Sequence, residues 1–213
     1  MGIRELSRNA IARGLSSCRP DDVVLISDID EIINPLAILK NKDKPGIKFF
    51  RQKLYYCFLN CECVGNVWDK PKMVFYKDLH SPQWLREYPN LPFSNKYMMK
   101  LAKLSRDVKQ VLGSKDLFIE DGGWHFSYLG GIERVKLKIK SFAHEEFDQE
   151  HYFQTENLLN AIENGEDLFG REGLRFEFLL IDNSFPRFLF ENQELYSSMI
   201  YNTGGSGPKM SGF

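Results

Sequence analysis

An acidic turn directly after an apolar strand is the feature that most limits what this chain can fold into. The run from Val23 to Ser27 is apolar except for its last residue, and it leads straight into the acidic segment Asp28 to Glu31. A short apolar run bounded in this way predicts a buried strand. In open α/β sheets, ligands bind outside the carboxyl ends of strands, so Asp28 and Asp30 are expected at a crevice. Two carboxylates there suit a hard divalent cation that carries phosphate oxygens.

The same segment also has a purely structural interpretation. Asp28 would then accept backbone N–H bonds within a turn. Asp30 and Glu31 would begin the first turn of the next helix, where the helix dipole favours negative charge. An Asp-x-Asp triplet is short enough to occur by chance, so both interpretations stay open until other parts of the chain are considered.

Composition indicates a globular chain without an overall electrostatic signal. The 213 residues are 43% hydrophobic and 14% aromatic, which is enough for one well-packed core. Lys and Arg number 28 against 29 Asp and Glu, so neither a nucleic-acid partner nor an anionic membrane surface is expected. No stretch approaches the roughly 18 apolar residues of a spanning helix, so we expect no membrane segment in this chain. The first residues lack a signal-peptide core, and the expected location is soluble and cytoplasmic unless an anchor or signal is encoded upstream.

The four cysteines are Cys18, Cys57, Cys61 and Cys63. Three of them fall within seven residues, but no second Cys or His pair at zinc spacing follows them. Aromatic and aliphatic residues surround Cys57 and Cys61, so we expect reduced thiols that pack as small apolar side chains.

The order of the first predicted elements is typical of an α/β fold. Apolar residues at near-helical spacing predict a helix over residues 3–17, which leads into the strand. After the acidic turn, Asn34 as a cap with Pro35 at the first helical position predicts a short helix through Leu39.

Later segments alternate between strand, loop and helix signals. Residues 46–60 and 71–77 are strand candidates that would pair as an antiparallel ribbon. Residues 78–94, rich in proline and aromatic side chains, look like a long loop or lid over a substrate. Paired glycines bracket an aromatic strand within residues 122–131. Helices are predicted over residues 98–111, from residue 132, and over 152–164.

Several blocks in this order resemble glycosyltransferase family 17, whose members include N-acetylglucosaminyltransferases that act on N-glycans. The blocks are an Arg-Asn helix ahead of the Asp-x-Asp strand, a Gly-Trp-His-Phe-Ser strand and a later Ser-Phe-Ala-His segment; they cover residues 8–15, 21–31, 123–127 and 141–144. The similarity extends from Leu6 to Tyr196. It implies an A-type glycosyltransferase (Rossmann-like) fold, a mixed sheet flanked by helices, in one domain over residues 1–200 with a flexible tail at 201–213. Family members also have an N-terminal portion that begins the sheet and holds much of the nucleotide, so the resemblance implies that this domain is incomplete at its N-terminus.

The resemblance implies a metal-dependent inverting transfer of N-acetylglucosamine from UDP-N-acetylglucosamine to a glycan acceptor. Mn²⁺ or Mg²⁺ bound by Asp28 and Asp30 would neutralise the departing diphosphate, with His144 as an additional ligand if the ion is Mn²⁺. A buried core histidine is an equal alternative for His144.

Contacts to the donor are expected from the Arg-Asn helix, at Arg8 and Asn9, and from Trp124 as an apolar platform for the sugar. Packing inside a strand is the more common role of such a Trp. Arg8 and Arg13 lie five residues apart, so on a helix at most one of them would reach a phosphate.

An inverting transfer needs one general base for the acceptor hydroxyl. The candidates are Asp121, His125, Glu145 and Glu146, with Asp121 and His125 first because they adjoin the double glycine. Each has a structural alternative, a turn acid for Asp121 and a strand residue facing a neighbour for His125.

Two other functions fit parts of the sequence. A phosphohydrolase of the haloacid dehalogenase type also has Asp-x-Asp after a strand, but usually has Thr or Val where Ile32 stands here. A non-catalytic module would bind a glycan or a partner through its aromatic-rich segment and would not bind nucleotide.

Overall fold

The computed structural model describes residues 8–88, 115–130, 134, 160, 164–166 and 174–201. The predicted helix at 98–111, His144, Glu145, Glu146 and all but the first residue of the predicted tail lie outside these ranges. The chain divides into two compact units, one made of residues 1–51 and 69–122 and the other of residues 52–68 and 123–213. None of the described helices is long and apolar enough to cross a membrane.

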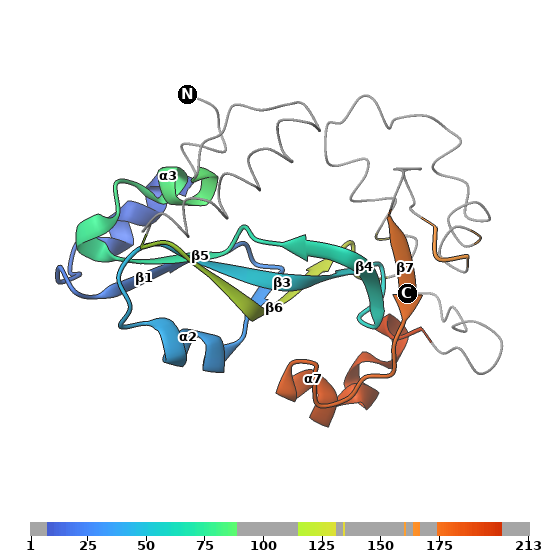
Figure 1. The fold of residues 1–213 in the computed structure, drawn as a ribbon. Coiled ribbons are helices and arrows are strands. Elements are labelled where there is room, and N and C mark those ends of the chain that lie inside the picture. The colour runs from blue at the N-terminus through green and yellow to red at the C-terminus, as the bar shows by residue number, and fades with distance from the viewer. Residues whose placement is uncertain are drawn as a thin grey trace. The chain divides into compact units, whose positions relative to one another are not determined.

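The first unit is built from short antiparallel strands with helices beside them (Figure 1). Strand β1 pairs antiparallel with β5, and β5 pairs antiparallel with the start of β3. Strand β2 pairs with β6, which also pairs with β3. The bounds are η1 (Ala10–Leu15), β1 (Val23–Ile26), β2 (Glu31–Ile33), α2 (Pro35–Asn41), β3 (Lys48–Tyr56), β5 (Lys72–Phe75), η2 (Tyr76–Asp78), α3 (Pro82–Glu87) and β6 (Leu117–Ser127).

Alternate residues of these strands pack on opposite faces, as the two-residue period of a strand requires. One face packs against Leu85 of α3, and its buried residues are Val24, Ile26, Ile47, Phe49 and Val74. The other face packs against Ala37 of α2, and its buried residues are Phe50, Met73 and Ile119. The strands of the first unit are therefore covered on both sides, α3 on one and α2 on the other (Figure 1).

Several predicted elements are confirmed. The strand after residue 22 is β1, and the predicted ribbon is the antiparallel pairing of β3 with β5. Asn34 caps α2 as predicted, since its Oδ1 accepts the Leu36 N–H at 3.0 Å. The backbone N–H of Asn34 also donates to the Gly122 carbonyl, which ties the start of α2 to β6.

The prediction of a long loop or lid over residues 78–94 is wrong for its described middle part. Residues Pro82–Glu87 form the helix α3, with the Ser81 hydroxyl accepting the Trp84 N–H at 3.1 Å. Its Leu85 is completely buried. A serine cap followed by proline is a helix start signal, and burial of Leu85 stabilises the short helix that follows. Residues 89–94 lie outside the described ranges.

The second unit contains the ends of β3 and β6 together with β4 (Cys61–Trp68), β7 (Arg175–Phe178), α7 (Arg187–Glu191) and η5 (Gln193–Met199). Strand β4 pairs antiparallel with both β3 and β7. The strand predicted at 46–60 is β3, which ends at Tyr56, four residues earlier than predicted, because the chain turns from Cys57, whose φ is 61°. Of the helix predicted over 152–164, the described part shows the Asn164 N–H donating to the Asn160 carbonyl, a helical i to i−4 bond.

The cysteine prediction is confirmed. Cys57, Cys61 and Cys63 are buried in an apolar cluster with Phe58 and Phe176. Burial raises the pKa of the Cys61 thiol to about 12, so this group stays protonated at neutral pH.

The paired strands run in the order β1-β5-β3-β4-β7, and β2 and β6 pair beside this path. The protein is mixed α/β, a mixed sheet flanked by helices.

Candidate functional site

The acidic turn after β1 is closed by its own first and last residues. The Glu31 N–H donates to the Asp28 carbonyl at 3.1 Å, and the Glu31 carboxylate accepts the Asp28 N–H at 2.7 Å. The two side chains differ in exposure. That of Asp28 is 44% exposed, whereas that of Glu31 is completely buried. The backbone-accepting role that the structural interpretation gave to Asp28 therefore belongs to Glu31.

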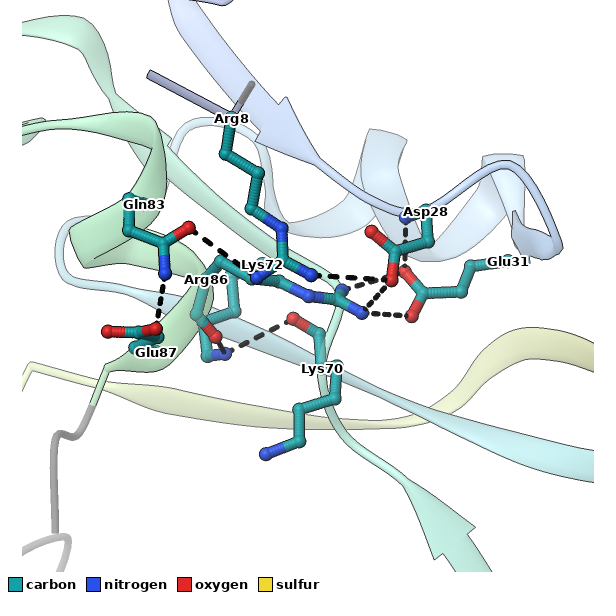
Figure 2. Close-up of polar contacts among 8 residues, drawn as sticks. All are labelled: Arg8, Asp28, Glu31, Lys70, Lys72, Gln83, Arg86 and Glu87. Atoms are coloured by element: carbon teal, nitrogen blue, oxygen red, sulfur yellow. Dashed lines mark hydrogen bonds and ion pairs between the residues drawn. The ribbon is translucent and has the colours of Figure 1, made fainter. Parts of the chain in front are cut away.

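A buried arginine from α3 binds the first and last acids of this turn (Figure 2). Arg86 donates from Nη1 to Glu31 Oε2 at 2.9 Å and from Nη2 to Glu31 Oε1 at 2.8 Å. Its Nη2 also donates to Asp28 Oδ2. The Arg86 side chain is only 6% exposed, and such a charge is stable in an interior when it is paired and hydrogen-bonded.

The predicted Arg-Asn helix meets the same site. The helix begins within the described residues at Arg8 and Asn9 and continues as η1. Arg8 Nη2 lies 4.0 Å from Asp28 Oδ2, and its Nη1 donates to the Gln83 side chain at 3.4 Å. Asn9 accepts the Gln83 N–H at 3.3 Å. In this structure the Arg-Asn pair therefore contacts the first turn of α3, while Arg13 donates to the Ala10 carbonyl at the surface.

A buried lysine supports the other end of α3. Lys72 Nζ donates to the carbonyls of Arg86 at 2.9 Å and Lys70 at 3.1 Å (Figure 2). The bond to Arg86 satisfies a backbone carbonyl at the end of the helix. Burial lowers the pKa of Lys72 to about 7. Helix α3 is thus bound at Arg86 twice, by Lys72 of β5 at the backbone carbonyl and by the acidic turn at the guanidinium.

The side-chain contacts that the described residues make to Asp28 all fall on one of its oxygens, and the side chain as a whole is 44% exposed. Both guanidinium contacts fall on Oδ2, and no residue of the described part of the chain donates a hydrogen bond to Oδ1. Asp30 lies half-buried in the same turn. Carboxylate oxygens are ligands that Mg²⁺ and Mn²⁺ prefer, so Asp28 and Asp30 have the donor chemistry for such an ion. Within the described ranges, no group of three or more His, Cys, Asp or Glu gathers in a metal-binding arrangement, and His144 lies outside them.

Asp121 also belongs to the first unit. It is exposed in strand β6 and has a left-handed backbone with φ of 51°. Asp tolerates this conformation better than most residues do. The Asn34 side chain donates to the Asp121 carbonyl at 3.1 Å, so the residue that follows β2 fixes the backbone of Asp121. Its carboxylate is accessible, as a general base requires.

Trp124 and His125 lie in the second unit and are packed side chains. Trp124 donates from Nε1 to the Ser184 carbonyl at 3.0 Å and packs against the cluster around Phe126. His125 is 6% exposed, and its ring centroid lies 4.3 Å from that of Trp68. Both residues therefore have the structural roles that the sequence left open, a packed strand tryptophan for Trp124 and a strand residue facing a neighbour for His125.

The sequence interpretation missed the two buried cations of this site. Arg86 lies 55 residues after Glu31, in the segment read as a loop, and Lys72 lies in a predicted strand. The only local signal for Arg86 is the Ser81-Pro82 helix start, which would have placed Arg86 on a short helix without naming its partners.

Comparison with known proteins adds no relative. No protein-family model matches the chain, and no curated protein and no solved structure matches it significantly.

Proposed function

We propose that this chain is a metal-dependent inverting glycosyltransferase of the A-type fold that moves N-acetylglucosamine from UDP-N-acetylglucosamine to a glycan hydroxyl. The observation that carries the proposal is the position of the Asp28 carboxylate and the contacts that it makes. Its carboxylate follows the end of β1, its Oδ2 accepts from Arg86, and its side chain is 44% exposed. A carboxylate at the end of a strand, fixed by a guanidinium and partly exposed, is suited to bind the cation of a nucleotide diphosphate.

The residues around the acidic turn have separate roles in this proposal. Asp28 and Asp30 would hold Mn²⁺ or Mg²⁺, which would supply Lewis-acid chemistry for the leaving diphosphate. Arg8, whose side chain is about a third exposed, adds positive charge beside the same carboxylate and attracts the phosphates. Arg86 is buried and orients Asp28.

The transfer needs a base on the acceptor side. The acceptor oxygen forms a bond to the anomeric carbon from the face opposite the diphosphate, the bond from that carbon to the phosphate oxygen breaks, and its electron pair leaves with UDP. The acceptor hydroxyl proton goes to a carboxylate. Asp121 is favoured over His125 for this role because its side chain is exposed, whereas that of His125 is packed against Trp68.

A transfer assay tests the proposal. Labelled UDP-N-acetylglucosamine and an N-glycan acceptor are incubated with the chain in MnCl₂ or in EDTA. We expect labelled glycan only with the metal, and much less of it for Asp28→Asn and Asp30→Asn. Asp43→Asn is the matched control, since Asp43 is an exposed acid of the same unit. Equal product in EDTA, or from Asp28→Asn, contradicts the proposal.

One observation favours a second candidate, a non-catalytic module that binds a glycan or a partner protein. Asp28 and Glu31 are already paired with Arg86, so the acidic turn has a complete structural role without any ligand. This candidate predicts no binding of UDP at any Mn²⁺ concentration, whereas the transferase predicts metal-dependent binding.

A further inference from the structure

Glu31 has a different surrounding from the two aspartates before it. Its side chain is completely buried, and both of its oxygens accept hydrogen bonds. A buried carboxylate that cannot reach solvent cannot contact a substrate directly. Its effect on the site must pass through the groups that it binds, and these include Arg86 and the backbone of Asp28.

Arg86 has two anionic partners among the described residues, and it divides its donors unequally between them. Two of its hydrogen bonds go to Glu31 and one goes to Asp28 Oδ2. A guanidinium fits a carboxylate best through two parallel N–H···O bonds. If position 31 carried no charge, Asp28 would be the remaining carboxylate, and the same pair of donors would close on both of its oxygens.

We infer that Glu31 is a positioning residue that retains Arg86 and thereby keeps Asp28 Oδ1 available to a divalent cation. This inference rests on the proposed function, in which Asp28 binds that cation. It assigns to the third acid of the turn the task of setting the cation affinity of the first. The other cations at the site, Arg8 and Lys72, cannot replace Glu31 as an acceptor for Arg86.

The inference is tested by Mn²⁺ binding without nucleotide. MnCl₂ is titrated into the full chain, and the free ion is measured by electron paramagnetic resonance. Glu31→Gln keeps the side-chain length and an oxygen for the Asp28 N–H, but it removes the charge that retains Arg86. Changes in residues that orient a metal ligand weaken metal binding by about 10- to 100-fold, and we expect a loss of this size. Glu87→Gln, an exposed change beside Arg86 on α3, should bind Mn²⁺ as the wild type does.

A double variant separates positioning from simple support of the turn. In Glu31→Gln with Arg86→Met, the competing guanidinium is gone, and the turn can still close through the amide oxygen of the introduced glutamine. Because Arg86 also orients Asp28, our inference predicts that Mn²⁺ affinity rises above that of Glu31→Gln without reaching the wild-type value. If Glu31 only supports the turn, the double variant binds as weakly as Glu31→Gln or more weakly. If Glu31→Gln fails to fold, which circular dichroism detects, the double variant is compared with the wild type alone, and a folded double variant that binds no Mn²⁺ overturns the inference.

The outcomes distinguish this inference from the proposed function. Unchanged Mn²⁺ affinity in folded Glu31→Gln overturns the inference and leaves the transferase proposal intact. A wild-type chain that binds no Mn²⁺ overturns both. If Mn²⁺ binding depends on Glu31 but the assay described above shows no sugar transfer, the inference is supported and the proposal of transferase activity is contradicted.

Discussion

Glu31 and Arg86, 55 residues apart in the chain, are joined by two hydrogen bonds of 2.8 and 2.9 Å, and both side chains are buried. This pair connects the acidic turn after β1 to helix α3. The helix is a single short segment, and an isolated helix of this length is unstable in water. Its position therefore depends on Leu85 on the strand side and on the contacts of Arg86.

We predict that Arg86→Met destabilises the protein strongly. The change leaves Glu31 buried and charged without its partner, and breaking a buried ion pair in this way costs about 3–5 kcal/mol. Urea unfolding followed by circular dichroism measures the loss. Arg187→Met is the matched control, because Arg187 is 88% exposed and its pair with Glu191 is expected to contribute less than about 1 kcal/mol. Similar losses for both variants would contradict the role given to Arg86.

Lys72 should make stability depend on pH in the neutral to alkaline range. Its pKa falls from its ordinary value of 10.5 to about 7 in the folded chain because of burial. Between these two values the unfolded chain binds a proton that the folded chain does not, so stability rises with pH, by at most about 1.4 kcal/mol per pH unit. Below about pH 7 both states are protonated and the effect of Lys72 no longer changes with pH.

The measurement is urea unfolding from pH 6 to pH 10 for the wild type and Lys72→Met. We expect the rise between pH 7 and pH 10 to be smaller in the variant. Lys40→Met is the control, since Lys40 is an exposed lysine at the end of α2. Parallel pH profiles for the wild type and Lys72→Met would show that the Lys72 amine does not cause the rise of stability with pH.

Gly122 should not tolerate a side chain. A Cβ added there would lie 2.7 Å from the Arg51 nitrogen and 2.8 Å from the Phe50 Cα, because β6 approaches the backbone of β3 closely. We expect Gly122→Ala to cost about 1–3 kcal/mol, as overpacking does, and to lower the melting temperature. Gly14→Ala meets nothing within 4 Å and should be neutral or slightly stabilising. A melting temperature for Gly122→Ala equal to that of Gly14→Ala would contradict this packing.

Asp121 should be needed for transfer and not for folding. Asn tolerates the left-handed backbone as well as Asp does, so Asp121→Asn removes the base and keeps the conformation. We expect kcat to fall by about 10²- to 10⁴-fold with an unchanged melting temperature. Glu120→Gln is the neighbouring control, whose carboxylate is exposed and pairs with Arg51. Equal kcat values for the two variants would remove Asp121 as the base.

Local signals in the sequence were sufficient for much of the first unit. The apolar run before Asp28 predicted β1, and the Asn34-Pro35 pair predicted the start of α2, because each signal acts within a few residues. The pairing of β3 with β5 also followed from two aromatic or β-branched runs. Near the acidic turn, the resemblance implied that the Arg-Asn helix and Asp28 both serve the donor, and in the structure Arg8 lies 4.0 Å from Asp28.

The contacts that define the site could not be predicted from local sequence signals. The choice of Arg86 as the partner of Glu31 depends on tertiary packing of α3, which has no periodic signal across 55 residues. Strand β7 is only four residues long and is stabilised by pairing with β4 rather than by its own pattern. For Trp124 and His125, the sequence could not decide between exposed and packed side chains, because burial depends on neighbours such as Trp68.

The central claim is that Asp28 and Asp30 hold a cation for the diphosphate of a sugar nucleotide, and calorimetric titration of UDP into the full chain tests it most directly. With MnCl₂ present we predict saturable binding that disappears in EDTA and is weakened at least about tenfold by Asp28→Ala and by Asp30→Ala. UDP binding that is absent at every Mn²⁺ concentration, or that is the same in both variants as in the wild type, would contradict the account.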